Sequence, residues 1–196
     1  MTDQKRPYRK KRRAELEAET RRRITESAVE LHGTLGPSRT SMSAVAEHAG
    51  VRRSTLYRHF PDEQALFNAC STHWRTLNPP PDLEVWAAIE DPDERLRRAL
   101  EELYGFYGRT REMLDNLFRD EATVPAVKKT FAAGFGAYMG AAQSTVLAGR
   151  GRAPQRVRAA IGHALSFHTW RSLAVEQRLD DSKAADLMCR LVLAAR

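Results

Sequence analysis

Apolar residues recur at intervals of three and four along most of this chain, the spacing that one buried face of an α-helix requires. An early run with this spacing is Ile24, Ala28, Leu31 and Leu35. It predicts a helix from about Ala14 to Leu35, which Gly36-Pro37 ends. No alternation of period two stands out, so no strands are predicted. We therefore expect an all-α protein.

The stretch Ser41–Phe60 reads as two short helices joined by a tight corner. Ser41 is a good N-cap for the first helix, because its hydroxyl can accept a hydrogen bond from a free amide of the next turn. Gly50 can adopt the left-handed conformation that closes this helix. Leu56 and Phe60, four apart, form the inner face of the second helix. With the preceding helix, this stretch predicts a three-helix helix-turn-helix unit.

The outer face of the second helix carries only groups that can donate to phosphates or base edges. They are Arg52, Arg53, Ser54, Thr55, Tyr57, Arg58 and His59. A solvated surface helix normally mixes charges of both signs, whereas this one has no carboxylate. The expected partner is therefore a polyanion, and a donor-rich helix of this kind fits double-stranded DNA.

Charge is distributed unevenly along the 196 residues. The net charge is +7, and residues 1–75 hold 15 Lys and Arg against 9 Asp and Glu, so the nucleic-acid footprint is predicted in the N-terminal third. Residues 1–13 are strongly basic and predict a disordered arm, which either stays a solvated tail or adds phosphate or minor-groove contacts. No apolar run is long enough to span a membrane, and two distant cysteines suit a reduced, cytoplasmic protein.

The run from Thr40 to Leu66, TSMSAVAEHAGVRRSTLYRHFPDEQAL, resembles the DNA-binding signature of the tetracycline-repressor (TetR) family. Two positions depart from the family pattern. Ala44 stands where an acidic residue usually completes the first cap, and Arg52 stands where Ser or Thr often caps the second helix. We expect the second helix to begin less firmly and Arg52 to gain a phosphate contact.

The resemblance implies roles for individual positions. Tyr57 and His59 stand where the family mostly grips phosphates, whereas Arg53 and Ser54 stand where side chains can reach bases. Thr40 and Ser41 complete the set of candidate DNA contacts. The resemblance further implies an N-terminal helix-turn-helix domain over residues 14–61 and a helical ligand-binding and dimerisation domain over residues 62–196.

Within the second region, helix breaks are predicted at Asp91-Pro92, near Gly108, at Val124-Pro125, across 149–154 and at Asp180-Asp181. A connecting helix is expected to run from Asp62, a plausible N-cap, to about Leu77. The last two helices are expected over 154–177 and 181–195. Their wide apolar faces, together with the resemblance, predict a homodimer that reads a palindromic operator.

Segment 131–142 is rich in Gly and Ala, a costly composition for a helix unless a neighbouring helix approaches closely or a ligand needs room. Aromatic and other large residues of this region either form the core or line an apolar pocket, and the resemblance favours a pocket for a small-molecule inducer. The candidates are Trp86, Tyr104, Tyr107, Met113, Phe118, Phe131, Phe135 and Tyr138.

Other classes of function lack support in the sequence. No nucleophile elbow, phosphate-binding glycine loop or metal-ligand cluster is present, so we expect neither an enzyme nor a metal or cofactor. Cys70 with His73, and His163 with His168, are too few or badly spaced to hold a metal. The prediction is a homodimeric repressor released by a small apolar or aromatic ligand; the alternative is a ligand-independent or architectural DNA-binding protein.

Overall fold

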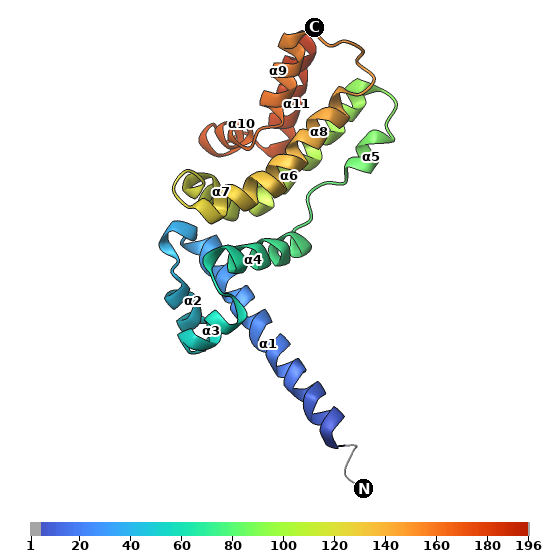
Figure 1. Cartoon of the computed structure of the whole chain (residues 1–196). Coiled ribbons are helices and arrows are strands. Elements are labelled where there is room, and N and C mark those ends of the chain that lie inside the picture. Colours follow the sequence, from blue (N-terminus) through green and yellow to red (C-terminus); the bar gives the residue numbers. More distant parts are fainter. Residues whose placement is uncertain (1–4, 196) are drawn as a thin grey trace. The chain divides into compact units, whose positions relative to one another are not determined.

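A computed structural model describes residues 5–195, which form helices and no strand (Figure 1). The chain divides into two compact units. The first comprises the chain up to Asn78 together with Asp115–Thr130, and the second comprises Pro79–Leu114 and Phe131–Arg196. The division differs from the predicted boundary at residues 61 and 62, because the connecting helix and Asp115–Thr130 group with the helix-turn-helix.

The first unit contains four complete helices and parts of two others. They are α1 (Lys5–Thr34), α2 (Met42–His48), α3 (Arg53–His59) and α4 (Glu63–Leu77), with the last turns of α6 and most of α7 (Pro125–Phe131). A single 3-10 turn, η1 (Pro37–Arg39), connects α1 to α2. Asp62 caps α4 by accepting a hydrogen bond from the Ala65 amide (2.7 Å), as predicted.

The predicted disordered arm is wrong from Lys5 onward, because α1 begins there and not near Ala14. Residues 1–4 of that arm lie outside the described residues. The periodic apolar pattern begins only at Ile24, where α1 packs against other helices, so it could not locate the start of the helix. Polar residues before that point carry no periodic signal, although they continue the helix.

The second unit contains α5 (Leu83–Ala87), most of α6 (Pro92–Asp120), α8 (Ala137–Leu147), α9 (Gln155–Ala164), α10 (Phe167–Arg171) and α11 (Asp181–Ala194). Two π-helical segments interrupt it, η2 (Ala132–Gly136) between α7 and α8 and η3 (Ser172–Glu176) after α10. Its core is built from fully buried aromatic and aliphatic side chains of α5, α6 and α10.

The helix break predicted near Gly108 is wrong, because α6 continues through it. Gly108 instead lies where a neighbouring side chain approaches α6 closely. A Cβ atom there would lie 2.8 Å from Oδ2 of Asp181, whose other carboxylate oxygen accepts a hydrogen bond from Nε1 of Trp170 (2.8 Å). The glycine therefore makes room for a neighbouring polar pair and does not end a helix.

The helix predicted over 154–177 is interrupted after Ala164. Ser166 begins α10 there, because its hydroxyl accepts a hydrogen bond from the amide of His168 (3.2 Å). Breaking the helix leaves the carbonyls of Ala164 and Leu165 free to accept from tyrosine side chains of α6. The final helix, α11, matches its predicted limits to within one residue.

Arg95 is a buried cation near the start of α6, and it is 5% exposed. Its guanidinium donates only to main-chain carbonyls at the ends of two helices. The acceptors are Trp86, Ile89 and Glu90, at and after the end of α5, and Thr145 and Ala148, at the end of α8. Carbonyls in a last helical turn lack an intrahelical partner and carry the negative end of the dipole, so one guanidinium satisfies both helix ends.

Candidate nucleic-acid interface

The corner between α2 and α3 forms as the sequence predicts. The Ser41 hydroxyl accepts from the Ala44 amide (3.1 Å), which caps α2. Gly50 adopts a φ of 63°, in the left-handed region, and its amide donates to the Glu47 carbonyl (3.0 Å). Val51 donates in turn to Ala46 (2.9 Å). Such paired bonds satisfy free carbonyls at a helix end and turn the chain towards α3.

The inner face of the unit is hydrophobic and well buried. Leu56 and Phe60 of the second helix are fully buried with Ile24 and Ala28 of α1, and Val45 of α2 is 1% exposed. This packing fixes which side of α3 is inside. The opposite side must face outward.

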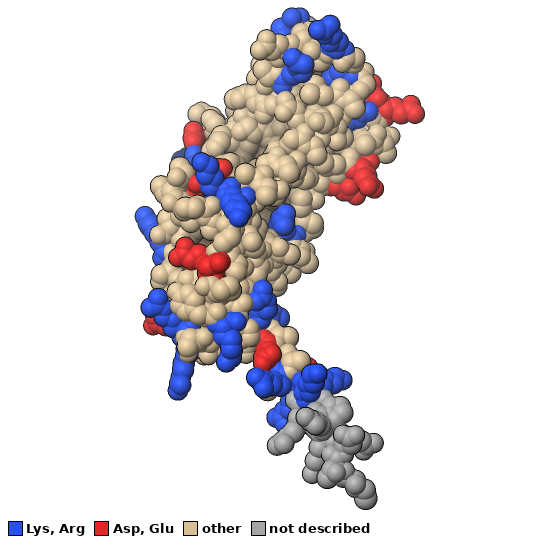
Figure 2. All heavy atoms as spheres, in the orientation of Figure 1, with Lys and Arg blue, Asp and Glu red and all other residues tan. Residues whose placement is uncertain are grey.

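The outward side of α3 carries exposed donors and no carboxylate. Arg53, Ser54, Tyr57 and Arg58 are all exposed, and Arg52 is exposed at the N-cap position. Arg52 makes no side-chain capping bond, as its departure from the family pattern predicts. Figure 2 shows Lys and Arg gathered over the part of this unit that contains α1 and α3. The arrangement presents positive charge and hydrogen-bond donors together.

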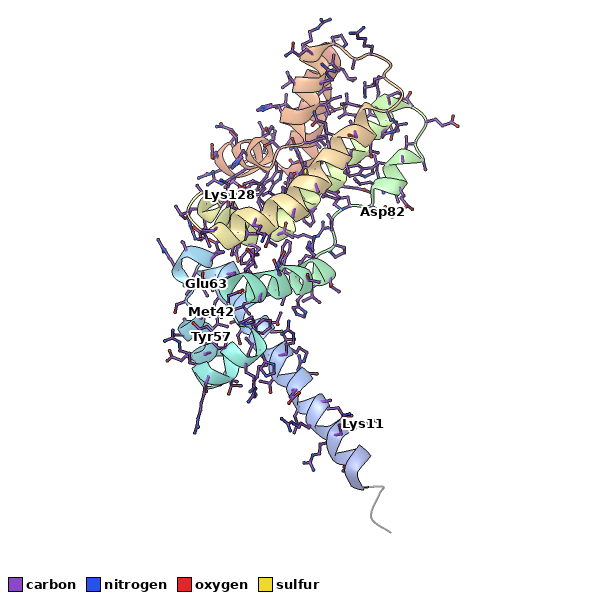
Figure 3. All side chains as sticks on the ribbon, in the orientation of Figure 1. Lys11, Met42, Tyr57, Glu63, Asp82 and Lys128 are labelled. Carbon is purple, nitrogen blue, oxygen red and sulfur yellow. The ribbon has the colours of Figure 1, made fainter. Side chains whose placement is uncertain are left out.

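Arg53 and Tyr57 lie one turn apart and contact each other. The Nη2 atom of Arg53 donates to the Tyr57 hydroxyl (3.4 Å), and its Cζ atom lies 5.4 Å from the centre of the tyrosine ring. Tyr57 is 38% exposed, and Figure 3 shows it on α3. The pair holds a guanidinium at the surface with most of its N–H donors open, the geometry that bidentate contact with guanine or phosphate requires.

Arg21 of α1 fixes the C-terminal end of α3. Its guanidinium lies 4.1 Å from the centre of the Phe60 ring, and its Nη1 atom donates to the His59 carbonyl (2.6 Å). A cation at the last carbonyls of a helix is favourable because of the helix dipole. Sequence reasoning missed this role, since Arg21 appears there only as part of a basic run with Arg22 and Arg23.

His59 differs from the other predicted contacts because it is half-buried, and its Nε2 atom is covered without a hydrogen-bond partner. Burial lowers the pKa of His59, and the neighbouring cations Arg58 and Arg21 lower it further. The imidazole is therefore held neutral against α1. It is a weaker candidate for a phosphate contact than Tyr57 or Arg58.

Three of the predicted DNA contacts are residues with hydroxyl groups, and the hydroxyls of two of them have local structural roles. Thr40 donates to the carbonyl of Gly36 (2.8 Å), and Ser41 caps α2. Thr55 is half-buried on α3. Ser41 stays exposed while it caps, so its hydroxyl can contact a phosphate at the start of α2.

The last turn of α6 grips the end of α1 within the first unit. The Asn116 amide donates to the carbonyls of His32 (3.1 Å) and Gly33 (2.6 Å), and the Arg119 guanidinium donates to the carbonyl of Leu35 (3.1 Å). Asp120, 2% exposed, accepts from the Ser38 amide (2.9 Å). We call Asn116, Arg119 and Asp120 the α6 clasp.

The carboxylate of the α6 clasp is held in its charged form. Burial alone would raise the pKa of Asp120, but hydrogen bonds from Arg119 and Ser38 outweigh burial, and the pKa is lowered. The carboxylate therefore keeps its hydrogen bonds at neutral pH. No sequence signal identified the α6 clasp, because its three side chains bind main-chain carbonyls and one main-chain amide more than 80 residues away.

In the second unit, the predicted ligand residues Trp86, Tyr104 and Tyr107 are fully buried. Their polar atoms are used inside the protein. The Tyr104 hydroxyl donates to the Ala164 carbonyl (2.8 Å), the Tyr107 hydroxyl donates to the Leu165 carbonyl (2.7 Å), and Nε1 of Trp86 donates to Glu102 (2.6 Å).

Phe131, Phe135 and Tyr138 lie at and beside η2 and are half-buried. The two phenyl rings stack with their centres 4.9 Å apart, and the Phe135 ring lies 6.5 Å from that of Tyr107. Tyr138 donates to the carbonyl of Pro81 (2.9 Å). The structure thus brings Tyr107, Phe131 and Phe135 into one aromatic cluster.

The other two predicted ligand residues are placed differently. Met113 is half-buried near the end of the α6 segment in the second unit, whereas Phe118 lies on the part of α6 that belongs to the first unit. Phe118 therefore groups with the DNA-binding helices. The sequence could not separate the two, because both residues lie on one continuous helix.

An open pocket of about 450 Å³ lies elsewhere in the second unit, lined by residues that sequence reasoning did not select. They are Asp91, Pro92, Asp93, Arg150, Ala153, Pro154 and Val157. Arg150 pairs there with Asp93 (2.9 Å). Ion pairing within the pocket wall gives both charges a structural role.

Neither a metal site nor a membrane span is found in the described part of the chain. Among residues 5–195, no three His, Cys, Asp or Glu side chains group in a way that would hold a metal ion. No helix in the same range has the length and apolarity needed to cross a bilayer.

Residues 24–70, which include α2, α3 and the start of α4, match the family model described as bacterial regulatory proteins, tetR family. No curated protein sequence matches the chain.

Solved structures of similar fold cover nearly the whole chain. A putative fatty acid metabolism regulator of Clostridium perfringens is 16% identical with a TM-score of 0.66, and the match covers 89% of this chain and 98% of that one. NalD, the secondary repressor of the MexAB-OprM multidrug efflux pump in Pseudomonas aeruginosa, is 21% identical with a TM-score of 0.62, covering 92% and 97%. The multidrug binding protein EbrR, complexed with imidazole, is 21% identical with a TM-score of 0.58, covering 88% and 89%.

Proposed function

Because the chain belongs to the tetR family of bacterial regulatory proteins, we propose that it is a cytoplasmic, homodimeric repressor that binds a palindromic operator and is released by a small apolar or aromatic ligand. The observation that carries the proposal is the outer face of α3. Exposed Arg53, Tyr57 and Arg58 stand there without a carboxylate, on a helix whose inner face is fixed by buried Leu56 and Phe60.

Dimerisation is supported by an apolar surface on the last helix. Leu187 and Leu191, one turn apart on α11, are 38% and 53% exposed, beside the buried residues Ala184 and Met188. A two-fold dimer through this face would pair two copies of α3, which must enter major grooves about 34–36 Å apart. Sedimentation of the full chain tests the dimer, and Leu187→Glu together with Leu191→Glu should yield monomers.

The first test of the function is selection of bound duplexes from a random DNA pool at near-physiological salt. We expect a two-fold symmetric motif with half-sites about one helical turn apart. Enrichment of no motif, with binding that disappears as salt rises, would contradict sequence-specific regulation and indicate nonspecific coating of DNA.

Substitutions in the Arg53–Tyr57 pair should separate base reading from phosphate binding. Arg53→Ala should cost about 1–3 kcal/mol on the operator and little on random DNA, because a guanidinium at a base edge carries discrimination. Tyr57→Phe should weaken binding to both DNAs alike, because phosphate contacts carry no sequence information. Affinities for operator and random duplexes at one salt concentration test both statements.

Arg75→Ala, which removes an exposed arginine near the end of α4, is the matched control and should leave both affinities unchanged. Equal losses on operator and random DNA for Arg53→Ala would contradict its role at a base edge.

For the ligand, the best-supported site is the aromatic cluster of Tyr107, Phe131 and Phe135. Segment η2 supports this choice, because π-helical turns are rare and are frequently found at functional sites. α6 runs from this unit into the first, where its clasp grips the end of α1, so a ligand that displaces α6 would reach the DNA-binding helices.

A ligand acts as an inducer only through differential affinity for two states. To change the ratio of the DNA-binding state to the released state from 99:1 to 1:99, the ligand must bind the released state more favourably by about 5.5 kcal/mol. We expect members of a panel of small aromatic compounds to raise the melting temperature and weaken operator binding together. Compounds that bind without changing operator affinity would contradict the inducer role.

A second candidate function is a DNA-binding regulator without a ligand. The observation that favours it is the complete burial of Trp86, Tyr104 and Tyr107, whose polar atoms are all satisfied internally. On this alternative, no compound of the panel changes the melting temperature, while the operator motif is still selected.

A further inference from the structure

The N-terminal part of α1 extends well beyond its packed part. Among the side chains of α1 whose burial the structure describes, Ile24 is the first buried one, and from Lys10 to Arg23 the side chains are exposed, with Thr20 partly covered. The helix begins at Lys5, so the 19 residues before Ile24 extend for about 28 Å at 1.5 Å per residue. Figure 1 shows this part of α1 extending past α3. We call residues 5–23 the α1 extension.

Charge is segregated along the α1 extension. Residues 5–13 hold seven Lys and Arg and no acidic residue, whereas residues 14–23 hold three Glu and three Arg. Arg22 pairs with Glu19 at 2.7 Å within the second part, and Arg13, the last residue of the first part, pairs with Glu17 at 3.1 Å while its side chain stays 84% exposed. Such pairs at i+3 and i+4 support an exposed helix. Residues 14–23, whose charges balance, therefore act as a neutral helical spacer. Residues 5–13 form a basic tip at its end.

The basic tip has a defined orientation around the helix. Eighteen residues make five helical turns, so Lys10 shares its angular position with Ala28, and Arg13 shares its position with Leu31. Ala28 is fully buried on the side of α1 that packs against the rest of the unit. Arg12 points to the opposite side of the helix, and Lys11 lies slightly more than a quarter turn from the packed side.

The packed side of α1 is also the side of α3. Arg21 joins the two helices through the Phe60 ring and the His59 carbonyl, which fixes their relative direction within the unit. A duplex on the outer face of α3 therefore lies on the side of the α1 extension that carries Lys10 and Arg13. The basic tip reaches DNA beyond the base pairs that α3 reads.

We propose that the α1 extension is a second DNA-binding element, a helical arm whose Lys10 and Arg13 face contacts phosphates flanking the operator half-site. This inference rests on the proposed function and deepens it, because it assigns to DNA a surface outside the helix-turn-helix. It also differs from a flexible basic tail, since only one side of a helix takes part.

The electrostatics of α1 fit an anion at this end. The first turn of α1 contains no acidic residue, so its amide groups and the positive end of the helix dipole lie among like charges. A free helix of this kind is only marginally stable in water. Phosphates near the tip relieve the repulsion, and DNA binding should therefore increase the helix content of the extension.

Two double substitutions with the same charge change test the proposal. Lys10→Gln with Arg13→Gln removes the proposed contact face, and Lys11→Gln with Arg12→Gln removes charge from the other sides. Each lost phosphate contact lowers the slope of log K against log salt by about 0.9. Because the proposed dimer loses two contacts in each protomer, the first variant should lose a slope of about 3.6 and bind the operator roughly 100- to 1,000-fold more weakly at 0.15 M salt. The second should change far less.

A helix-breaking substitution tests whether the arm acts as a helix. Ala18→Pro interrupts the neutral spacer without changing any charge, because proline removes an intrahelical hydrogen bond and clashes with the preceding turn. It should reproduce the loss seen for the Lys10 and Arg13 variant. Circular dichroism of each variant checks that the packed helices remain folded.

Operator length gives an independent readout. An arm of 28 Å spans about eight base pairs, so trimming the flanks of the operator by that length should weaken the native protein and leave the Lys10 and Arg13 variant unchanged. Equal losses of operator affinity in the two double variants would contradict the helical arm and favour a flexible tail. Full operator affinity of Ala18→Pro would have the same meaning. Full affinity of all three variants would overturn any DNA contact by the extension.

These outcomes are distinct from failure of the proposed function. If the protein selects no operator motif at all, the regulator proposal fails before the arm is tested. If the motif is selected with unchanged sequence preference by every variant, the regulator proposal stands and the affinities alone decide on the arm.

Discussion

Arg95→Ala is expected to lower the free energy of unfolding by about 3–5 kcal/mol, because several carbonyls at two helix ends lose a charged donor in a buried place. The side chain is 5% exposed, so water cannot readily replace it. The carbonyl of Trp86 lies in the last turn of α5 and that of Ile89 just after it, and those of Thr145 and Ala148 lie at the end of α8. Removing the guanidinium should therefore loosen both helix ends together.

The measurement is urea-induced unfolding followed by circular dichroism at neutral pH. Arg97→Ala is the matched control, because Arg97 lies two residues along the same helix, is 45% exposed and pairs with Glu94, which is 56% exposed. Exposed pairs of this kind contribute about 0–1 kcal/mol. A loss for Arg95→Ala no greater than that of the control would contradict the bridging role. Arg95→Lys should recover only part of the loss, since one ammonium group cannot span both helix ends.

Acidification from pH 7.5 to pH 5 is expected to destabilise the first unit by about 2 kcal/mol through His32. Burial lowers the pKa of His32 to about 4, although the nearby Asp120 favours the charged form. The ring lies 5.3 Å from that of Phe67, and its Nδ1 atom lies 3.5 Å from Sγ of Cys70. In the unfolded chain, the same histidine takes up its proton near pH 6.5.

The protein is less stable at low pH because the unfolded state binds a proton on His32 more readily than the folded state does. Between pH 6.5 and about pH 4 the unfolded chain carries a proton on His32 that the folded chain excludes, so stability is complete above pH 6.5 and falls as the pH falls. Urea unfolding at pH 7.5 and pH 5 measures the difference. His32→Leu should abolish most of the pH dependence, whereas His73→Gln, which removes a half-buried histidine from α4, should preserve it. An unchanged pH dependence in His32→Leu would contradict the assignment.

The helix-turn-helix could be placed from the sequence because local interactions define it. The Ser41 cap, the left-handed Gly50 and the inward pair of Leu56 and Phe60 each depend on residues within one or two turns. Periodicity and capping report such interactions directly. The all-α class and most helix limits were predictable for the same reason.

Errors arose where a residue's role depends on distant parts of the chain. Gly108 reads as a helix breaker, but it is a packing position against Asp181 in a helix that continues. The start of α1 was predicted too late because exposed, charged turns have no apolar period. Tyr104 and Tyr107 were candidates for a pocket, yet their hydroxyls bind carbonyls near residue 165.

By itself, the sequence determined that the chain is helical, where its DNA-reading helix lies, and which side of that helix faces outward. Only the tertiary structure decided the partners of Arg95, of the α6 clasp and of the aromatic cluster. Periodicity shows that a side chain is buried, but it does not show against what. The partners of these side chains are mostly main-chain carbonyls that folding brings close. Every residue has such a carbonyl, so the sequence does not show which of them a side chain will bind.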